Sequence, residues 1–296
     1  MTRSTRRRLL SGLLTGVVVL AGATGCATQE VEGEAHADTA ARQSYLRSVF
    51  DARFAAASEQ FSPGSDVAGL EYVSTLGGTG ELELTRDVVL MGDPATVVVR
   101  ESSSREGDTI DVYHEGGSES DFLLLGSMFA GLSPTLWTEV PTVVGAGEDP
   151  CALPAQRIFC GATAALEAEE GDSASVYDLT TDEDGTSRVS VTTPLANVVG
   201  QAEVLALPDG VVDVEGVDEN AVATITIESD AEGAFRALEL SAPLGADAGR
   251  LLVGFSSSGP VDPDEVPEAP SPFDVTTIDE SDVDAFYEEI QRLRDE

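Results

Sequence analysis

Only two histidines, His36 and His114, could act as general bases near neutral pH. A Ser-His-Asp arrangement would have to use His114, because His36 stands in a polar stretch close to the N-terminus. The sequence contains no G-x-S-x-G elbow, phosphate loop, dinucleotide fingerprint or H-E-x-x-H motif. Paired carboxylates could serve a glycosidase, but among 54 Asp and Glu residues no pair stands out. These residues favour a protein that is not an enzyme and uses no cofactor or metal.

Cys26 follows a segment with the pattern of an export signal. Residues 3–8 are rich in arginine, and the apolar stretch after them is too short to span a ~30 Å hydrocarbon core. Ala23-Thr24-Gly25-Cys26 resembles a lipobox, the recognition sequence of bacterial lipoproteins, with Ala23 in place of the usual leucine. The resemblance implies that residues 1–25 form a signal peptide and that Cys26 becomes the diacylated N-terminus.

Two acyl chains give a stable membrane anchor, so we expect a lipid-anchored protein on the extracytoplasmic face of the cell membrane. Residues 26–38 are polar and acidic and are expected to form a tether. An ordinary secretory signal with an incidental cysteine is the alternative. Thr5 to Leu10 also resembles a twin-arginine export motif, so the export route stays open.

The two remaining cysteines are Cys151 and Cys160. In an exported chain, two cysteines this close in sequence favour a disulfide that closes a short loop. A metal pair or a redox pair is the poorer interpretation, because there is no C-x-x-C motif and no histidine lies nearby.

The charge of the chain excludes one class of partner. All 16 basic residues are arginine, and the formal net charge is −38. A surface this acidic repels phosphate backbones, so we expect no nucleic-acid binding. The charge would repel an anionic bilayer as well, so any membrane attachment must come from something other than charge. The sequence does not identify a protein partner.

The segment from Thr39 to Phe61 is expected to be an amphipathic helix, because its apolar residues recur every three or four positions. Phe50, Phe54 and Phe61 form a stripe along it. We interpret this stripe as core packing, with a lipid-contacting face as the alternative.

Beyond this helix the apolar residues alternate with polar ones, which is typical of antiparallel strands with one solvated face. Two acidic, glycine-containing segments, 182–185 and 230–233, are expected to be hairpin turns; a calcium loop is the alternative for the first. The candidate strands lie at 81–84, 95–100, 109–112, 188–191, 224–228, 238–240 and 251–255.

Three other stretches have different patterns. Residues 122–129, with 136–141 after them, and residues 195–207 are expected to be helical or irregular. Residues 260–272 form an acidic, proline-rich insert, and residues 279–296 carry the spacing of a C-terminal amphipathic helix.

Three local patterns carry a resemblance to a known family: Thr109–Tyr113 with Leu136–Val140, Ile225–Gly233 with Leu238–Leu240, and Leu252–Val261 with Pro272–Val275. They resemble the LppX/LprG-type lipoproteins of actinobacteria, whose fold is similar to that of the lipoprotein carrier LolA. The insert, the cysteine loop and the terminal helix depart from the family. The resemblance implies a highly curved sheet with helices against its concave side, enclosing an apolar cavity for acylated lipids.

We therefore expect an α+β domain over residues 39–278: a single, strongly curved and partly closed antiparallel sheet of about ten strands. The N-terminal helix is expected to pack on its concave side. The expected function is that of an envelope lipoprotein that binds or carries an acylated lipid or other hydrophobic ligand. The alternative is a structural or interaction module with a filled core and no ligand. No residue is singled out for ligand binding.

Overall fold

The computed structural model describes most of the chain beyond the predicted tether. The signal peptide, Cys26 and all of the tether except Asp38 lie outside the described residues. The described residues are 38–61, 64–76, 83–103, 105–142, 151, 153–168, 175–205, 207, 221–243, 249–262, 266 and 270–295.

The first helix, α1, spans Thr39–Gln60, as the spacing of its apolar residues predicts. Asp38 caps its start, where a carboxylate oxygen accepts a hydrogen bond from the backbone N–H of Ala40 at 3.3 Å. Of its 22 residues only Leu46, Phe50 and Ala57 are buried, so the helix contacts the rest of the protein through a narrow stripe.

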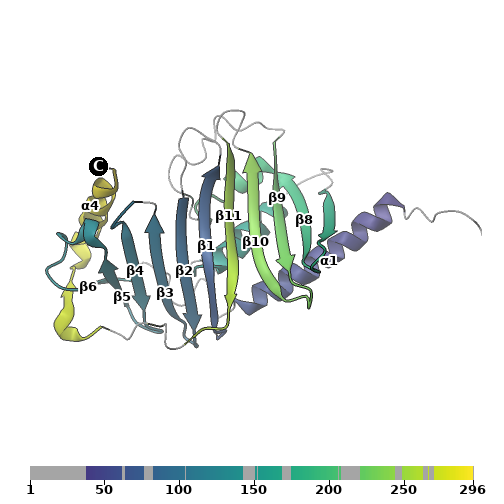
Figure 1. The fold of residues 1–296 in the computed structure, drawn as a ribbon. Helices are drawn as coiled ribbons and strands as arrows, with labels where there is room; N and C mark the ends of the chain where they lie inside the picture. The colour runs from purple at the N-terminus through teal and green to yellow at the C-terminus, as the bar shows by residue number, and fades with distance from the viewer. Residues whose placement is uncertain are drawn as a thin grey trace, which may run out of the picture. The chain divides into compact units, whose positions relative to one another are not determined.

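Twelve strands form one sheet (Figure 1), so the expected number of about ten was too low. The sheet is open, with β12 and β7 at its edges in the part of the chain that is described, and this contradicts the expected partial closure. The strands are β1 (Val67–Leu76), β2 (Glu83–Met91), β3 (Thr96–Ser103), β4 (Thr109–His114), β5 (Ser120–Leu125), β6 (Trp137–Pro141), β7 (Tyr177–Thr181), β8 (Ser187–Pro194), β9 (Val222–Ser229), β10 (Phe235–Pro243), β11 (Arg250–Gly259) and β12 (Val275–Thr277).

The sheet consists of two antiparallel meanders. Strands β1 to β6 form one and β7 to β11 the other, and they join where β1 pairs with β11. Only β12 runs parallel to its neighbour, β6. Both predicted turns close hairpins, with Gly185 at φ +88° and Gly233 at φ +87°, a backbone conformation that glycine adopts without strain.

The remaining helices are short. The α-helices are α2 (Gln156–Glu167), α3 (Leu195–Val199) and α4 (Val283–Asp295), and the 3₁₀ turns are η1 (Ser127–Phe129), η5 (Pro272–Asp274) and η6 (Glu280–Asp282). Helix α4 confirms the predicted C-terminal helix, and α3 occupies the start of the 195–207 stretch.

The prediction for residues 122–129 was wrong for half of their length, because Phe122 to Leu125 belong to β5, and it was confirmed at the 3₁₀ turn Ser127–Phe129. This strand is apolar on both faces: Leu123 contacts one hydrophobic cluster, and Phe122 and Leu124 contact another on the opposite side. A strand with two apolar faces does not alternate, so its periodicity cannot be distinguished from that of a buried helix. The 136–141 stretch was mispredicted in the same way and is β6.

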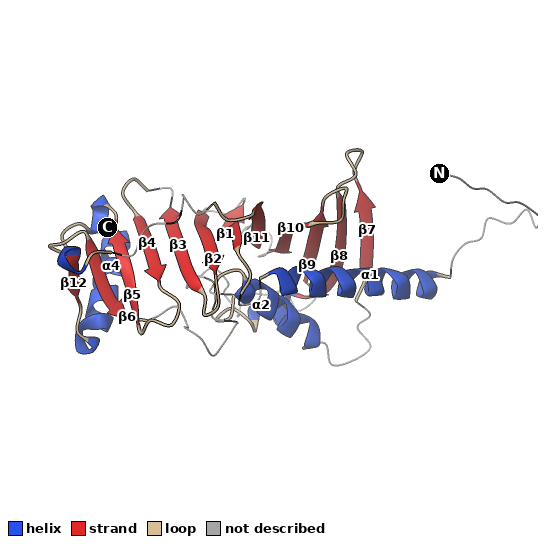
Figure 2. Cartoon of the chain, turned by 90° about the horizontal axis from the view of Figure 1, so that it is seen from below, coloured by secondary structure: helices blue, strands red, loops and turns tan. Residues whose placement is uncertain are grey.

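One face of the sheet carries the core, and we call it the helix-covered face. Cross-strand partners such as Val88 and Val99, or Ile227 and Leu238, point to this face together. Helices α1 and α2 lie along one side of strands β7 to β11 (Figure 2). Farther along the same face, Phe286 and Ile290 of α4 pack on apolar residues of β4 to β6.

Candidate ligand-binding face

The Cys151–Cys160 pair is joined in the structure, with sulfur atoms 2.01 Å apart and Cα atoms 5.7 Å apart. Cys160 lies on α2, a helix that the sequence interpretation did not anticipate. The disulfide therefore ties the segment before α2 to the helix that covers the sheet. Because Cys26 lies outside the described residues, its lipidation stays a prediction.

The phenylalanine stripe of α1 packs in the core. Phe50 and Phe61 are each 1% exposed. The ring of Phe61 lies 4.8 Å from that of Phe255, 5.3 Å from that of Phe235 and 5.4 Å from that of Phe159, measured between centroids. Aromatic side chains from a helix, two strands and a second helix thus fill the space between α1 and β9 to β11.

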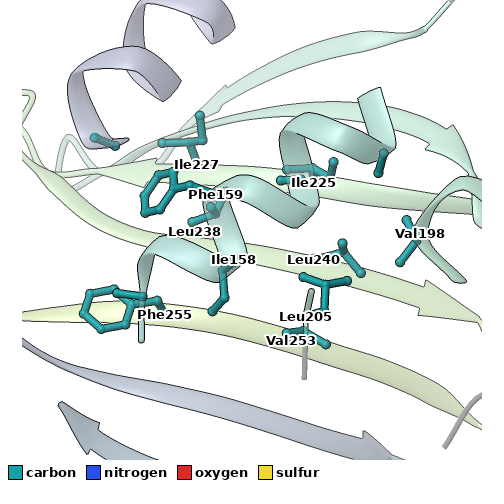
Figure 3. Close-up of a cluster of buried hydrophobic side chains, with 14 of the residues drawn as sticks. Ile158, Phe159, Val198, Leu205, Ile225, Ile227, Leu238, Leu240, Val253 and Phe255 are labelled. Carbon is teal, nitrogen blue, oxygen red and sulfur yellow. The ribbon is translucent and has the colours of Figure 1, made fainter. Parts of the chain in front are cut away.

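Strands β9 to β11 present aliphatic side chains toward α2. In Figure 3, Ile227 of β9 and Leu238 of β10 lie near Ile158 and Phe159 of α2, and Leu240 lies near Leu205 in the same hydrophobic cluster. Ile227 is 1% exposed, which confirms the face assigned to it from its alternation with Thr226 and Glu228. This half of the helix-covered face is mainly apolar, with a few buried polar side chains such as Thr193 and Ser229.

A chain of ion pairs crosses the middle of the same face. The Nε of Arg86 donates to Glu101 at 2.9 Å and its Nη1 donates to Glu71 at 3.3 Å. Arg294 of α4 donates to Glu101 at 2.6 Å and to Asp108 at 2.9 Å. We call this set the arginine–carboxylate chain; its members are Arg157, Glu71, Arg86, Glu101, Arg294 and Asp108.

The arginines control the titration of the carboxylates in this chain. Burial alone would raise the pKa of Glu71, but the hydrogen bonds and charges of Arg157 and Arg86 together hold that pKa below its ordinary value of 4.5. In the same way, Arg86 and Arg294 outweigh burial and lower the pKa of Glu101. Both side chains therefore stay charged at neutral pH, and the chain connects α2 and α4 through β1, β2 and β3.

Beyond this chain, a mixed apolar and polar region lies beneath α4. Its apolar part includes Ile110, Leu123 and Val140 from the sheet and Phe286 and Ile290 from the helix. Its polar part is a buried pair in β4 and β5, where Nδ1 of His114 lies 2.8 Å from Oδ1 of Asp121. The sequence interpretation treated His114 as an ordinary strand residue; it is 2% exposed and hydrogen-bonded.

Thr138 of β6 and Thr142, the residue after β6, add to this polar part. The hydroxyls of Thr138 and Thr142 are buried and make no hydrogen bond within the described residues. Buried hydroxyls are almost always hydrogen-bonded in native proteins, because leaving one unpaired costs about 1–3 kcal/mol. The region beneath α4 thus combines apolar walls with hydrogen-bonding capacity that the described residues do not satisfy.

The sequence interpretation missed the arginine–carboxylate chain, although a signal for it exists. Arg86 stands two residues before Val88, and Glu101 stands two residues after Val99, so each charge is in phase with the buried side chains of its strand. Such charges on the core side of a strand indicate an internal ion pair. The partner from α2 could not be inferred, because that helix was not predicted.

Two further properties concern the described residues only. No helix among them is long and apolar enough to cross a membrane. No group of three or more His, Cys, Asp or Glu side chains within the described ranges is arranged to hold a metal ion.

Comparisons with known proteins give distant structural neighbours. No family model matches the chain, and no curated protein matches it. The crystal structure of the lipoprotein LppX from Mycobacterium tuberculosis is similar at 14% identity and a TM-score of 0.36, over 74% of this chain and 97% of LppX. A DUF1329-family protein from Desulfovibrio piger matches at 8% identity and a TM-score of 0.21, over 71% of this chain and 91% of its own.

Proposed function

We propose that this protein is a membrane-anchored envelope lipoprotein that binds or carries an acylated lipid or another hydrophobic ligand on its helix-covered face. The anchor is the diacylated Cys26, and the domain stands on the extracytoplasmic side of the membrane. The role is one of binding, without catalysis. Among the described residues His114 is the only histidine, and it is buried against Asp121.

The observation that carries this proposal is the way α1 covers the sheet. Strand residues such as Val189, Val191 and Ile225 are fully buried, and they lie in the cluster that α1 enters. The helix itself buries only Leu46, Phe50 and Ala57. Val49 and Phe54 also pack on this cluster, and Gln43 and Arg53 hydrogen-bond to Tyr177 and Ser187. If α1 moves aside, it exposes an apolar face of the sheet that another apolar group could cover.

An acyl chain can take the place of such a cover. Each methylene that leaves water for an apolar surface contributes about 0.8 kcal/mol. A chain lying across β7 to β9 would replace the contacts of Phe50 and of the half-buried Val49 and Phe54. The driving force is the hydrophobic effect, which needs no directional contact along the chain.

The alternative is a structural or interaction module whose core is already filled. The contacts among the phenylalanine rings favour it, because Phe61, Phe159, Phe235 and Phe255 pack at centroid distances of 4.8–6.0 Å. In that case the helix-covered face is a solid core with the packing density of other protein interiors, and no ligand enters it.

Native mass spectrometry of the protein, extracted gently from its own host, separates the two functions. The proposal expects co-purifying species heavier than the diacylated chain, which organic solvent releases as lipid. A spectrum that contains only the acylated chain, together with no saturable binding of an apolar fluorophore, would leave the filled-core module as the function.

A further inference from the structure

The region beneath α4 holds buried polar groups that do not belong to the arginine–carboxylate chain, and the hydroxyls of two of them, Thr138 and Thr142, have no hydrogen-bond partner among the described residues. His114 is 2% exposed, Asp121 is 1% exposed and Thr138 is 0% exposed. Fully buried polar side chains are costly unless they are satisfied. A cluster of such side chains in one region therefore needs a group that satisfies their hydrogen bonds.

The strand register brings these groups together. Asp121 of β5 is directly opposite His114 of β4 on one side and Val140 of β6 on the other. Thr138 and Thr142 stand two residues before and after Val140, so each is a diagonal cross-strand neighbour of Asp121. Diagonal neighbours lie about 7–8 Å apart, a separation that a small group between them can bridge with hydrogen bonds.

The orphan hydroxyls are the observation that points to a ligand. Oγ1 of Thr138 and Oγ1 of Thr142 are buried and have no partner among the described residues. A threonine hydroxyl both donates and accepts, and the carboxylate of Asp121 accepts. The region can therefore offer donors and acceptors to the same small group.

We propose that this region, defined by His114, Asp121, Thr138 and Thr142, binds the polar end of the ligand, and that this end is neutral and carries hydroxyl groups. The inference rests on the proposed function, and it concerns a ligand whose attached chain lies under α4, on β4 to β6. Six strands separate β5 from β9, so this chain is distinct from one that lies across β7 to β9. One hydroxyl can donate to Asp121 while it accepts from one of the threonines. Thr138 and Thr142 are four extended residues apart, about 13 Å, so each needs a hydroxyl of its own. The adjoining apolar residues Ile110, Leu123 and Phe286 contact the first part of the attached chain.

The charges of the region favour a neutral group over an anionic one. Burial and the charge of Asp121 raise the pKa of Tyr287, on α4, to about 12, so this tyrosine is close enough to Asp121 to sense its negative potential. Arg294, which is also on α4, is already paired with Glu101 and Asp108. A carboxylate or phosphate would be repelled by Asp121, whereas a neutral hydroxyl meets no repulsion.

Two probes with the same acyl chain test the inference on the purified Cys26→Ser chain. Monopalmitoylglycerol carries two hydroxyls and methyl palmitate carries none; each is used to displace a bound apolar fluorophore at submicellar concentration. We expect monopalmitoylglycerol to displace the fluorophore at about fivefold lower concentration, the effect of one additional hydrogen bond. The double variant Thr138→Val, Thr142→Val should lose this preference and still bind methyl palmitate.

Stability and a matched control show whether the hydroxyls act on the ligand. The valine variants should be at least as stable as the parent chain, because they remove unpaired buried hydroxyls. Thr193→Val is the control: this threonine is 1% exposed, and its hydroxyl donates to the carbonyl of Ala165 at 3.3 Å. It should lower stability and leave the preference for hydroxyls unchanged.

Each failure has a different meaning. Equal displacement by the two probes, or a preference that survives in the double valine variant, would overturn the hydroxyl site and leave the proposed function standing. Palmitate, which carries a carboxylate, serves as a third probe. If it displaces the fluorophore at a lower concentration than monopalmitoylglycerol does, the assignment of a neutral group is overturned. If the fluorophore itself does not bind saturably, the proposed function fails and the inference fails with it.

Discussion

Arg157 of α2 and Glu71 of β1 form an ion pair on the core side of the sheet, with Nε of the arginine 2.5 Å from Oε1 of the carboxylate. Glu71 is 2% exposed and also accepts a hydrogen bond from Arg86. A carboxylate buried this deeply is stable only because two guanidinium groups surround it. The pair therefore attaches α2 to the centre of the sheet, at the strand where the two meanders join.

Replacing Glu71 with glutamine should destabilise the fold by about 3 kcal/mol, because it leaves two largely buried guanidinium groups without their shared carboxylate. Urea unfolding measures the change. The Arg42–Asp178 pair gives the control: its side chains are 63% and 59% exposed, so Arg42→Ala should change the free energy of unfolding by less than about 1 kcal/mol. If the two variants lowered the free energy of unfolding equally, the buried pair would contribute no more to stability than the exposed pair.

The same pair predicts a dependence on pH. The pKa of Glu71 is below 4.5 in the folded protein, because Arg157 and Arg86 outweigh the effect of burial. A carboxyl whose folded pKa is lowered contributes stability that is present above the unfolded pKa and is lost as pH falls through the folded pKa. The difference in unfolding free energy between the parent chain and Glu71→Gln should be constant above about pH 5.5 and shrink below pH 4.5. A difference that grows on acidification would contradict this assignment.

The disulfide makes a separate prediction about α2. Intact mass under non-reducing conditions should be two hydrogens below the reduced mass, and a thiol reagent should label neither Cys151 nor Cys160 in the folded protein. Replacing both cysteines with serine should lower the free energy of unfolding by about 2–3 kcal/mol, because the closed loop is short. Labelling of either cysteine in the folded parent chain would show that the disulfide does not form.

The sequence predicted the parts of the fold where one physical signal dominates. The alternation of apolar and polar residues predicted strands such as β8 and β9. The acidic, glycine-containing segments 182–185 and 230–233 predicted the hairpin turns next to these strands. It failed where a strand is buried on both faces, as in β5, because the period-two signal is then absent. Helix α2 was not predicted, because the segment between Cys151 and Cys160 was interpreted as a short loop closed by a disulfide. The helical spacing of Ile158, Phe159 and Ala162 was a signal for the helix.

The candidate site was harder to predict, because its residues come from strands that are distant in sequence. Thr138 and Asp121 become neighbours only through the register of β5 against β6. This register depends on the turns and on which residues of both strands are buried, so it cannot be predicted from the sequence of one strand. Arg294 stands in the predicted C-terminal helix, but nothing in that helix indicates that Glu101 and Asp108 are its partners.

Replacing Cys26 with serine tests the membrane anchor. Without the thiol no diacylglyceryl group can be attached, so the protein should leave the membrane and appear in the medium or in the soluble envelope fraction. The parent chain, with two acyl chains, should sediment with membranes in high salt. Sedimentation of Cys26→Ser with membranes in detergent-free, high-salt buffer would show that the lipobox interpretation is wrong.

The last prediction concerns Ile227, which lies between Val189 and Leu238 on the helix-covered face. If acyl chains occupy this face, Ile227→Trp should weaken saturable binding of an apolar fluorophore at least fivefold, because the larger ring takes the volume that a chain would use. Long-chain lipid should displace the fluorophore from the parent protein. Circular dichroism should show the same fold for both.

The neighbouring Thr226 provides the control, because it points to the opposite face of β9 and is only partly buried. Thr226→Trp adds a similar ring without entering the helix-covered face, so it should leave fluorophore binding unchanged. In a filled core, by contrast, Ile227→Trp lowers the free energy of unfolding by about 1–3 kcal/mol, since overpacking forces neighbours out of their rotamers. Loss of stability in Ile227→Trp, with no saturable binding in the parent chain, would identify the protein as a filled-core module and exclude the carrier function.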